Sequence, residues 1–326
     1  MMYCPVTETP VHEIYWPHSG GNRIFLKRDD LQPFSFGGNK VRIGWAFLQD
    51  MRKNGADAML LYGDRRSNLC RVLAAMCGIE QIPCRMIATS GSGTESVSFN
   101  ETLTGMFDVP VIYCEKNGIA DEVDRQMEAF KSRGRTPYYI YGSRLGTGNE
   151  GTAAEAYAEA VPEILSWEKQ HDLTFDRIFV PCGTGATAGG IAAGLSGAGV
   201  RREVTALSIS SRSRERQEQA LRDAVYACLE KRGSSVSDTD VQLPECITEY
   251  NGGGYGLADA SVMEVTERML LLNAVPLTPI YSGKAFAGML RYIEERGIRG
   301  QNLLFLHTGG LPLFFDDLRD NKLCAK

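Results

Sequence analysis

The chain has 326 residues, 43% of them hydrophobic, and a formal net charge of -5. This length and composition predict a substantial core in one large or two medium domains. Acidic and basic side chains are interspersed, which argues against a nucleic-acid-binding surface, and the sequence has no apolar run long enough to span a bilayer.

Residues 1–5 lack the basic and apolar regions of a secretory signal, so we expect a cytoplasmic protein. The nine cysteines include no Cys-x-x-Cys pair, and their odd number indicates reduced thiols rather than a disulfide framework. Cys70 and Cys77 are expected to be small buried side chains on one helix face. The four histidines lack helical metal-ligand spacing, so we expect no metal site, and His307 is expected to be structural.

Strand-like and helix-like segments alternate along the chain. In chain order we expect strand 23–30 leading into a loop, helix 41–54, strand 58–62, helix 68–77 closed by Gly78, strand 84–89, helix 99–106, strand 109–114, helix 119–133, strand 138–141, helix 152–169, strand 177–181, helix 186–195, strand 204–210, helices 213–231, 259–273 and 284–296, and strand 303–307. This alternation predicts an α/β fold with mainly parallel sheets and helices on both faces. Two lobes with a ligand between them fit the length.

A lysine stands at a predicted junction between a loop and a helix. Gly37 and Gly38 let the backbone turn tightly, and Asn39 and Lys40 lead directly into the helix. By itself this pattern also fits an ordinary turn followed by an exposed lysine. A lysine fixed at such a junction is well placed to have a lowered pKa and to attack a carbonyl group as a neutral amine.

Residues 183–187, with the sequence Gly-Thr-Gly-Ala-Thr, connect a predicted strand to a predicted helix. Backbone N–H groups at a helix N-terminus, together with the hydroxyls of Thr184 and Thr187, form an anion site. A lysine able to form a Schiff base and a separate phosphate-binding loop together suggest pyridoxal 5'-phosphate (PLP) as the cofactor.

The same loop permits a second interpretation. Gly183-x-Gly185-x-x-Ala188 fits the relaxed dinucleotide fingerprint. An NAD enzyme would have an acidic residue after the next strand, but residues 208–212 contain none, which disfavours NAD. NADP stays open, because Arg212 can meet a 2'-phosphate.

Three further segments carry side chains suited to a small ligand. Ser67 and Asn68 follow a predicted strand and are either helix caps or groups that bind a carboxylate and a ring oxygen. Tyr255 lies in a glycine-rich loop and Tyr281 lies directly before a helix. Each tyrosine is either a packing residue or an acid, base or positioning group. Thr308 follows the last strand and can donate a hydrogen bond to a ring nitrogen.

In this order the motifs resemble those of the fold-type II PLP enzymes, specifically the D-cysteine desulfhydrase and 1-aminocyclopropane-1-carboxylate (ACC) deaminase family. The similar segments cover nearly the whole chain and are 27–30 with 36–42, 67–71, 183–187, 255–256, 281–284 and 307–310. The resemblance implies a tryptophan-synthase-β-like fold and a homodimer. It also implies a larger PLP-binding lobe of residues 1–45 and 156–326 and a smaller lobe of residues 46–155.

The resemblance also implies a role for each matching residue. Lys40 would hold the cofactor and later move protons at the substrate α-carbon, and Asn68 would bind the ring hydroxyl. Ser67, Tyr255 and Tyr281 would surround the substrate. The cofactor phosphate would be held by Gly183, Thr184, Gly185, Ala186 and Thr187.

One departure from the family pattern bears on the reaction. The deaminase branch has a glutamate facing the pyridine nitrogen, directly after the tyrosine that matches Tyr281, and this position is Ser282 here. Ring-opening deamination is therefore disfavoured, and Thr308 becomes the expected partner of the ring nitrogen. A less protonated ring is a weaker electron sink, which suits β-elimination with a good leaving group.

Other departures bear on the substrate. Leu69 stands where the family has a histidine, and Arg66, next to Arg65, stands where it typically has glutamine. Arg144 occupies a position that tends to be neutral in the family. We hypothesise that one of these arginines receives an extra anionic group of the substrate, such as a sulfonate or a second carboxylate. The alternative is that all three are solvated surface charges.

These observations predict a PLP-dependent lyase that performs α,β-elimination on a small amino acid and yields a 2-oxo acid and ammonia. A β-replacement synthase, or a sulfo-lyase or deaminase acting on a related, dianionic amino acid, is the alternative within the family. An NADP-binding oxidoreductase and a non-catalytic ligand sensor are the alternatives from other classes. The presence of Lys40 and the phosphate-binding loop argues against the sensor.

Overall fold

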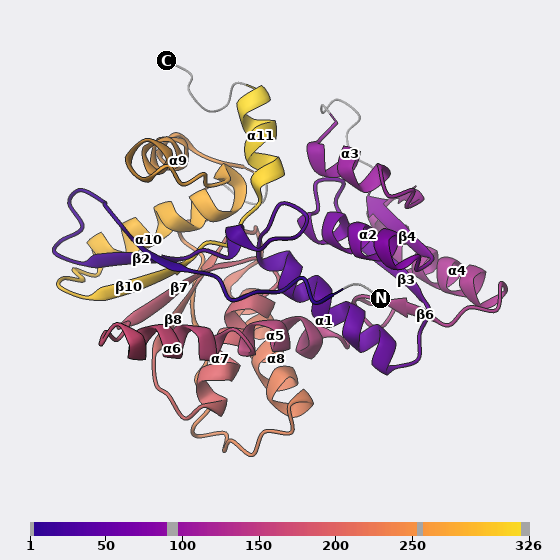
Figure 1. Cartoon of the computed structure of the whole chain (residues 1–326), viewed down its shortest axis with the longest axis horizontal. Helices are drawn as coiled ribbons and strands as arrows, with labels where there is room; N and C mark the ends of the chain where they lie inside the picture. Colours follow the sequence, from indigo (N-terminus) through magenta and orange to yellow (C-terminus); the bar gives the residue numbers. More distant parts are fainter. Residues whose placement is uncertain (1–2, 90–96, 253–256, 321–326) are drawn as a thin grey trace.

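The computed structural model describes residues 3–89, 97–252 and 257–320 and contains two β-sheets flanked by helices (Figure 1). The larger sheet has the strand order β1-β2-β10-β7-β8-β9, in which only the β1–β2 pair is antiparallel among the described strands. These strands are β1 (Val11–Ile14), β2 (Arg23–Lys27), β7 (Arg177–Cys182), β8 (Glu203–Ser208), β9 (Glu245–Ile247) and β10 (Asn302–Leu306). Strands from the two ends of the sequence, β2 and β10, are therefore neighbours.

The smaller sheet is parallel, with the strand order β5-β4-β3-β6. Its strands are β3 (Ala58–Gly63), β4 (Cys84–Thr89), β5 (Val111–Cys114) and β6 (Pro137–Tyr139). The two sheets confirm the expected α/β fold with mainly parallel strands. The lobe boundaries after residues 45 and 155 stay a prediction.

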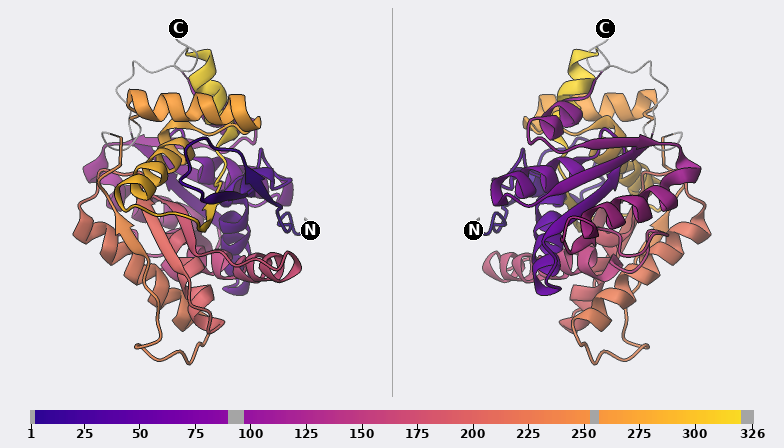
Figure 2. Two further views of the ribbon diagram at one scale, coloured as in Figure 1. Left: turned by 90° about the vertical axis from the view of Figure 1, so that its left-hand side faces the viewer. Right: turned by 90° about the vertical axis from the view of Figure 1, so that its right-hand side faces the viewer.

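Helices cover both faces of each sheet. They are α1 (Asn39–Lys53), α2 (Asn68–Glu80), α3 (Phe99–Gly105), α4 (Ile119–Lys131), α5 (Glu150–Ala158), α6 (Val161–Gln170), α7 (Ala186–Gly197), α8 (Arg214–Lys231), α9 (Ala260–Asn273), α10 (Lys284–Glu295) and α11 (Leu311–Arg319). Helices α9 and α10 lie on one side of the larger sheet, and α5, α7 and α8 lie on the other (Figures 1 and 2).

Alternate residues of β3 explain how the smaller sheet is covered. Successive side chains of a strand point to opposite faces. Met59 and Leu61 join the cluster that includes the buried side chains of α1 and α2, while Ala58 and Leu60 pack with Phe130 of α4. Both faces are apolar, as expected for a buried parallel strand.

Helix α1 connects the two halves of the molecule. It packs against α2 on one side and α5 on the other, in the middle of the ribbon (Figure 1). Val41, Phe47 and Leu48 are buried along it. The first turn of α1 is thereby held between the carboxyl ends of strands from both sheets, where ligands of α/β proteins bind.

The sequence-based boundaries were wrong in two helices. The expected single helix 152–169 is divided into α5 and α6, because Pro162 lacks the N–H that an uninterrupted helix would need there. Helix α2 continues past Gly78 and ends at Glu80, with Gln81 in the left-handed conformation. A Cβ at position 78 would lie 2.9 Å from the ring of Phe107, so this glycine allows close packing instead of ending the helix.

Three elements, β1, β9 and α11, were not expected from the sequence. The two strands have only four and three residues, which gives too short a run for a periodic signal. The small residues of α7 allow a close approach to a neighbouring helix, because a Cβ at Gly190 would lie 2.1 Å from the carbonyl oxygen of Ala154 in α5.

Among the described residues, no helix is long and apolar enough to cross a membrane. The same part of the chain holds no group of three His, Cys, Asp or Glu side chains arranged to bind a metal ion. The described cysteines are all free thiols, and Cys70 and Cys77 are buried as expected.

Candidate active site

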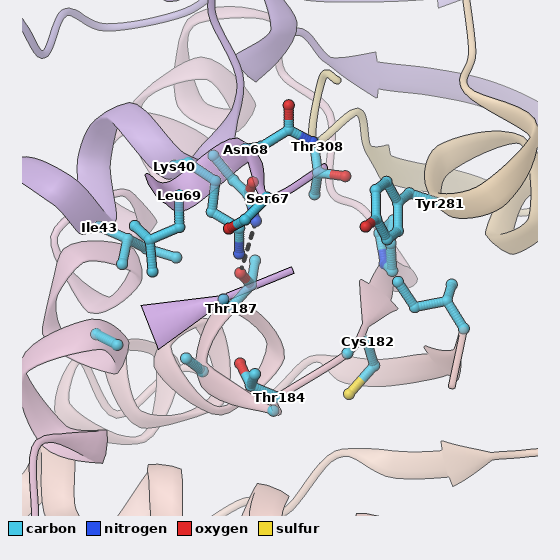
Figure 3. Close-up of a pocket in the computed structure, with 18 of the residues that line it drawn as sticks. Lys40, Ile43, Ser67, Asn68, Leu69, Cys182, Thr184, Thr187, Tyr281 and Thr308 are labelled. Atoms are coloured by element: carbon cyan, nitrogen blue, oxygen red, sulfur yellow. Dashed lines mark hydrogen bonds between the residues drawn. The ribbon is translucent and has the colours of Figure 1, made fainter. Parts of the chain in front are cut away.

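A cavity of about 280 Å³ lies where loops from the two sheets meet. Its wall combines the turn after β3 with the loops after β7 and β10 and the first turn of α1. The predicted site residues that line it are Lys40, Ser67, Asn68, Gly183, Thr184, Gly185, Ala186, Thr187, Tyr281 and Thr308 (Figure 3). The remaining predicted residue, Tyr255, lies outside the described residues.

Backbone hydrogen bonds hold Lys40 beside the end of β10. The N–H of Gly38 donates to the carbonyl of Asp29 over 2.9 Å, and the N–H of Asn39 donates to the carbonyl of Thr308 over 3.0 Å. Gly38 has a φ of +97°, and a Cβ there would lie 2.9 Å from the Thr308 carbonyl oxygen. The position therefore requires glycine, and it starts α1 with Lys40 in the first turn.

Burial lowers the pKa of Lys40 to about 8. Removal from water destabilises the charged ammonium more than the neutral amine. At pH 8 the Lys40 amine is therefore neutral in about half of the molecules. The neutral amine is the form that attacks an aldehyde carbon. Lys40 also lines the cavity, so that a ligand has access to its amine.

The predicted phosphate-binding loop has the geometry of an anion site. Strand β7 ends at Cys182 and α7 begins at Ala186, so that the free N–H groups of the first turn of α7 lie at the cavity. The side-chain amide of Asn39 donates to the hydroxyl of Thr187 over 3.1 Å. This bond connects the loop 183–187 to the residue next to Lys40, and it thereby fixes the distance between Lys40 and the predicted phosphate site.

Ser67 is both a helix cap and a cavity residue. Its hydroxyl oxygen accepts a hydrogen bond from the N–H of Cys70 over 3.2 Å at the start of α2. A hydroxyl that accepts one bond still carries its own O–H donor. The cap and the functional interpretation are therefore compatible, and the N-terminus of α2 adds a favourable field for an anion.

Tyr281 and Thr308 line the cavity from the larger sheet. Tyr281 lies in a π-helical turn, Pro279–Gly283, directly before α10. The neighbouring Ser282 is fully buried, and its hydroxyl accepts a hydrogen bond from the N–H of Thr278 over 3.0 Å. Ser282 thus closes this turn and is not part of the cavity wall.

His307 is structural, as expected. Its Nδ1 accepts a hydrogen bond from the N–H of Gly309 over 3.1 Å, and its Nε2 lies 2.9 Å from the carbonyl oxygen of Pro276. Since burial lowers the pKa of His307, the neutral ring donates from Nε2 and accepts at Nδ1. Both ring nitrogens are therefore hydrogen-bonded to backbone groups, those of Pro276 and Gly309.

The arginines proposed to contact the substrate do not line the cavity. The guanidinium of Arg144 lies 2.6 Å from Asp121 and also pairs with Asp124, both on α4. Arg65 lies 3.6 Å from Glu101. Two carboxylates thus already neutralise Arg144, which argues against a contact with the substrate, and the hypothesis stays a prediction. Leu69, in place of the family histidine, does line the cavity.

Several cavity residues were missed by the sequence analysis, namely Ile43, Phe47, Asp64, Tyr141, Cys182 and Ile209. Ile43 and Phe47 lie three and seven residues after Lys40, and this helical spacing indicates a shared face. Asp64 lies two residues after the predicted strand 58–62, in the turn that leads to Ser67, which is also a usable signal. Tyr141 and Ile209 have no such local signal.

Comparison with known proteins assigns the class of this site. Residues 5–309 match the protein family described as "Pyridoxal-phosphate dependent enzyme", so the chain belongs to this family. It is 27% identical over 303 residues to a D-cysteine desulfhydrase of Yersinia enterocolitica, covering 90% of this chain and 88% of that protein. It is 28% identical over 303 residues to a D-cysteine desulfhydrase of Klebsiella pneumoniae, covering 90% and 89%.

Solved structures agree with this assignment. An ACC deaminase homologue is 25% identical, with a TM-score of 0.83 over 98% of this chain and 94% of that one. A hydrogen sulfide-producing enzyme from Fusobacterium nucleatum matches with a TM-score of 0.64 at 18% identity over 94% and 97% of the two chains, which shows the shared fold. The protein is therefore a PLP-dependent enzyme of fold type II, and PLP is its cofactor.

The residues present fit PLP. The Lys40 amine with its lowered pKa suits an aldehyde, and the N-terminus of α7 suits a phosphate. The family assignment also decides against the NADP alternative. Arg212, on which that alternative depended, donates instead to the carbonyl of Gly183 over 3.3 Å.

Proposed function

We propose that this protein is a PLP-dependent lyase that catalyses α,β-elimination on a small amino acid, in the manner of a D-cysteine desulfhydrase. The observation that carries the proposal is that one cavity of about 280 Å³ is lined by Lys40, Ser67, Asn68, the loop 183–187, Tyr281 and Thr308. The D-cysteine desulfhydrases among its relatives support the same reaction. The products would be a 2-oxo acid, ammonia and the released β-substituent.

In this proposal each group of residues binds one part of the cofactor. Lys40 would attach to the aldehyde carbon, and residues 183–187 would hold the phosphate. Asn68 would bind the ring hydroxyl, and Thr308 would bind the pyridine nitrogen. Bound PLP would supply an electron sink for the electrons of the broken Cα–H bond.

The side chains of this chain would perform the remaining steps. The Ser67 O–H and the N-terminus of α2 would bind and orient the substrate carboxylate. The Lys40 amine, when neutral, would take the proton from Cα. The β-substituent would then leave with its bonding electrons, and the released aminoacrylate would hydrolyse to pyruvate and ammonia. Tyr281 would position the substrate or protonate the leaving group.

Elimination is favoured over ring-opening deamination by the surroundings of the ring nitrogen. The position that would need an acid is Ser282, which is buried and bonded to the backbone of Thr278. A neutral Thr308 beside the pyridine nitrogen would leave the ring less protonated than an acid would. A weaker electron sink suits a substrate with a good leaving group on Cβ, such as a thiol.

We also propose a cytoplasmic homodimer, as the family resemblance implies. Arg65 and Arg66 do not line the cavity, which weakens the idea of a dianionic substrate. A β-replacement synthase differs only in the fate of the aminoacrylate. Cysteine synthase of Entamoeba histolytica has the same fold, with a TM-score of 0.68 at 15% identity over 97% of this chain and 89% of that one.

The test is the reaction of the purified holoenzyme with the D and L forms of cysteine, serine and cysteate. Pyruvate, ammonia and the released group are measured together. Elimination predicts equal amounts of pyruvate and ammonia without an added nucleophile. A dependence of turnover on an added thiol, with no pyruvate, would instead establish β-replacement and overturn the proposal.

The cofactor lysine is tested on the same preparation by its visible absorption band. Lys40→Ala should abolish the band that borohydride removes from the wild type. Lys53→Ala, an exposed lysine at the other end of α1, is the matched control and should keep it. A band that persists in Lys40→Ala would show that another lysine holds the cofactor.

A further inference from the structure

The side-chain amide oxygen of Asn68 accepts hydrogen bonds from two buried donors. Its Oδ1 accepts a hydrogen bond from Nδ2 of Asn100, over 3.0 Å, and from the guanidinium of Arg71, over 3.5 Å. Asn100 and Arg71 are 0% and 1% exposed, and neither lines the cavity, whereas Asn68 does. The two donors thus stand between Asn68 and the protein interior.

The orientation of Asn100 is itself fixed. Its Nδ2 also donates to the backbone carbonyl of Arg66 over 2.7 Å. A carbonyl oxygen only accepts, so turning the Asn100 amide over would bring two acceptors together. Asn100 must therefore present its NH₂ group to Asn68, although its own buried Oδ1 has no hydrogen-bond partner among the residues that the structure describes.

Arg71 enforces the same orientation, because a guanidinium only donates. It is anchored by a 2.7 Å hydrogen bond to the hydroxyl of Ser35 and lies over the ring of Phe36. Both contacts come from the loop that leads to Lys40. With Asn100 and Arg71 behind it, the Asn68 amide has its oxygen away from the cavity and its nitrogen toward the turn at Thr308, as Figure 3 shows. A Cβ at Gly310 would lie 3.6 Å from that nitrogen.

We propose that Asn100 and Arg71 are positioning residues that lock the Asn68 amide with its NH₂ group toward the cavity, so that Asn68 donates a hydrogen bond to the phenolic oxygen of PLP. Without these two donors, the amide could also turn its oxygen toward the cavity. Two oxygens would then face each other, which repels an ionised phenol. This inference rests on the PLP cofactor and not on the substrate or the reaction.

A double-mutant cycle on cofactor affinity tests the lock. The dissociation constant of PLP is measured by equilibrium dialysis against the apo forms of Asn100→Leu, Asn68→Ala and the double variant. Loss of one hydrogen bond to a charged group weakens binding by roughly tenfold. Asn100→Leu should show this loss, and adding it to Asn68→Ala should change the affinity by less than about twofold.

The control lies on the same helix. The hydroxyl of Thr104 donates to the backbone carbonyl of Asn100 over 2.8 Å, and its side chain has no hydrogen bond to Asn68 among the bonds of the described residues. Thr104→Val should perturb α3 without turning the Asn68 amide, and it should bind PLP as the wild type does. An equal loss in Asn100→Leu and Thr104→Val would overturn the proposal, because it would assign the effect to α3.

A second signature separates the lock from a merely structural role. Arg71→Met and Asn100→Leu should both move the visible absorption maximum of the bound cofactor in the same direction as Asn68→Ala. If Asn100→Leu does not fold, Asn100→Asp decides, since it has nearly the same shape but offers only acceptors to Asn68. Wild-type affinity and an unchanged spectrum in Asn100→Asp would overturn the proposal.

Discussion

The backbone N–H of Asn39 donates a hydrogen bond of 3.0 Å to the carbonyl of Thr308, which joins the residue before Lys40, the proposed cofactor lysine, to the turn after β10. The two residues come from opposite ends of the chain and meet because β2 and β10 are parallel neighbours. Residues 37–39 and residues 308–310 thus form one compact backbone junction. Lys40 and Thr308 line the same cavity beside it.

The close approach at Gly309 should be essential. Gly309 has a φ of +78°, and a Cβ there would lie 2.5 Å from the Cα of Gly38. Gly309→Ala should therefore combine backbone strain of about 1–2 kcal/mol with a clash, and it should weaken PLP binding because the turn that carries Thr308 moves. Urea denaturation and cofactor titration measure the two effects.

Gly199→Ala is the matched control for strain alone. Gly199 has a φ of +65°, and no atom of the described part of the chain lies within 4 Å of a Cβ at that position. It should lose only about 1–2 kcal/mol of stability and should bind PLP as before. Equal losses of stability and unchanged cofactor affinity in both variants would refute a special role for the contact between Gly38 and Gly309.

A buried charge network should stabilise the start of α1. Arg42 lies 3.0 Å from Asp29 and 2.7 Å from Glu163, and Lys27 also pairs with Glu163. Burial alone would raise the pKa of Asp29, but the positive charges of Arg42 and Lys27 hold that pKa below its usual value. Arg42→Met would leave two carboxylates with one cation, and we expect it to cost about 3–5 kcal/mol of unfolding free energy.

The exposed pair of Arg23 and Glu13, 2.7 Å apart, provides the comparison for this network. Arg23→Met should cost less than about 1 kcal/mol, because water screens an exposed pair. Both values follow from urea denaturation of the apo proteins. A similar cost for Arg42→Met and Arg23→Met would mean that the buried network adds no stability.

Lys40 should make the stability of the apo protein depend on pH. Its pKa falls from 10.5 to about 8 on folding. Between these values the unfolded chain binds a proton that the folded chain does not, so stability rises with pH across this window, by at most about 1.4 kcal/mol per pH unit. Below pH 8 both states are protonated and this contribution is flat. Lys40→Met should be more stable than the wild type at pH 7, with the difference shrinking toward pH 10.

The measurement is the difference in unfolding free energy between Lys40→Met and the wild type at pH 7, 8, 9 and 10, which cancels the other titrating groups. A difference that stays constant over this range would show that the pKa of Lys40 is not lowered in the folded protein. A difference that grows with pH would show the opposite sign of shift.

Ser67 should affect both stability and substrate binding. Ser67→Ala removes the N-cap of α2 and should cost about 1 kcal/mol of stability. Because the proposed function gives its O–H to the substrate carboxylate, KM should also rise by about tenfold. Ser213→Ala removes the corresponding cap of α8, so it should lose similar stability with KM unchanged. A KM that changes in neither variant would leave Ser67 as a helix cap only.

The local sequence determined most of the individual helices and strands. Most strands and helices were predicted to within a few residues, because apolar runs and helix caps act over short distances. Glycine pairs before Lys40 and around Thr184 marked the two turns that line the cavity. The exceptions had local causes that were misread, such as Pro162, which divides a predicted helix, and Gly78, which packs against Phe107.

Tertiary structure decided which charged and polar groups belong to the site. Arg144 looked available in the sequence, but α4 brings Asp121 and Asp124 against it. Asn100 had no motif of its own, yet α3 places it behind Asn68. Such pairings depend on which helices and strands are neighbours, and this is set by sheet order and packing between distant segments. The sequence by itself determined the glycine turns and the position of Lys40, whereas only the tertiary structure decided which side chains surround them.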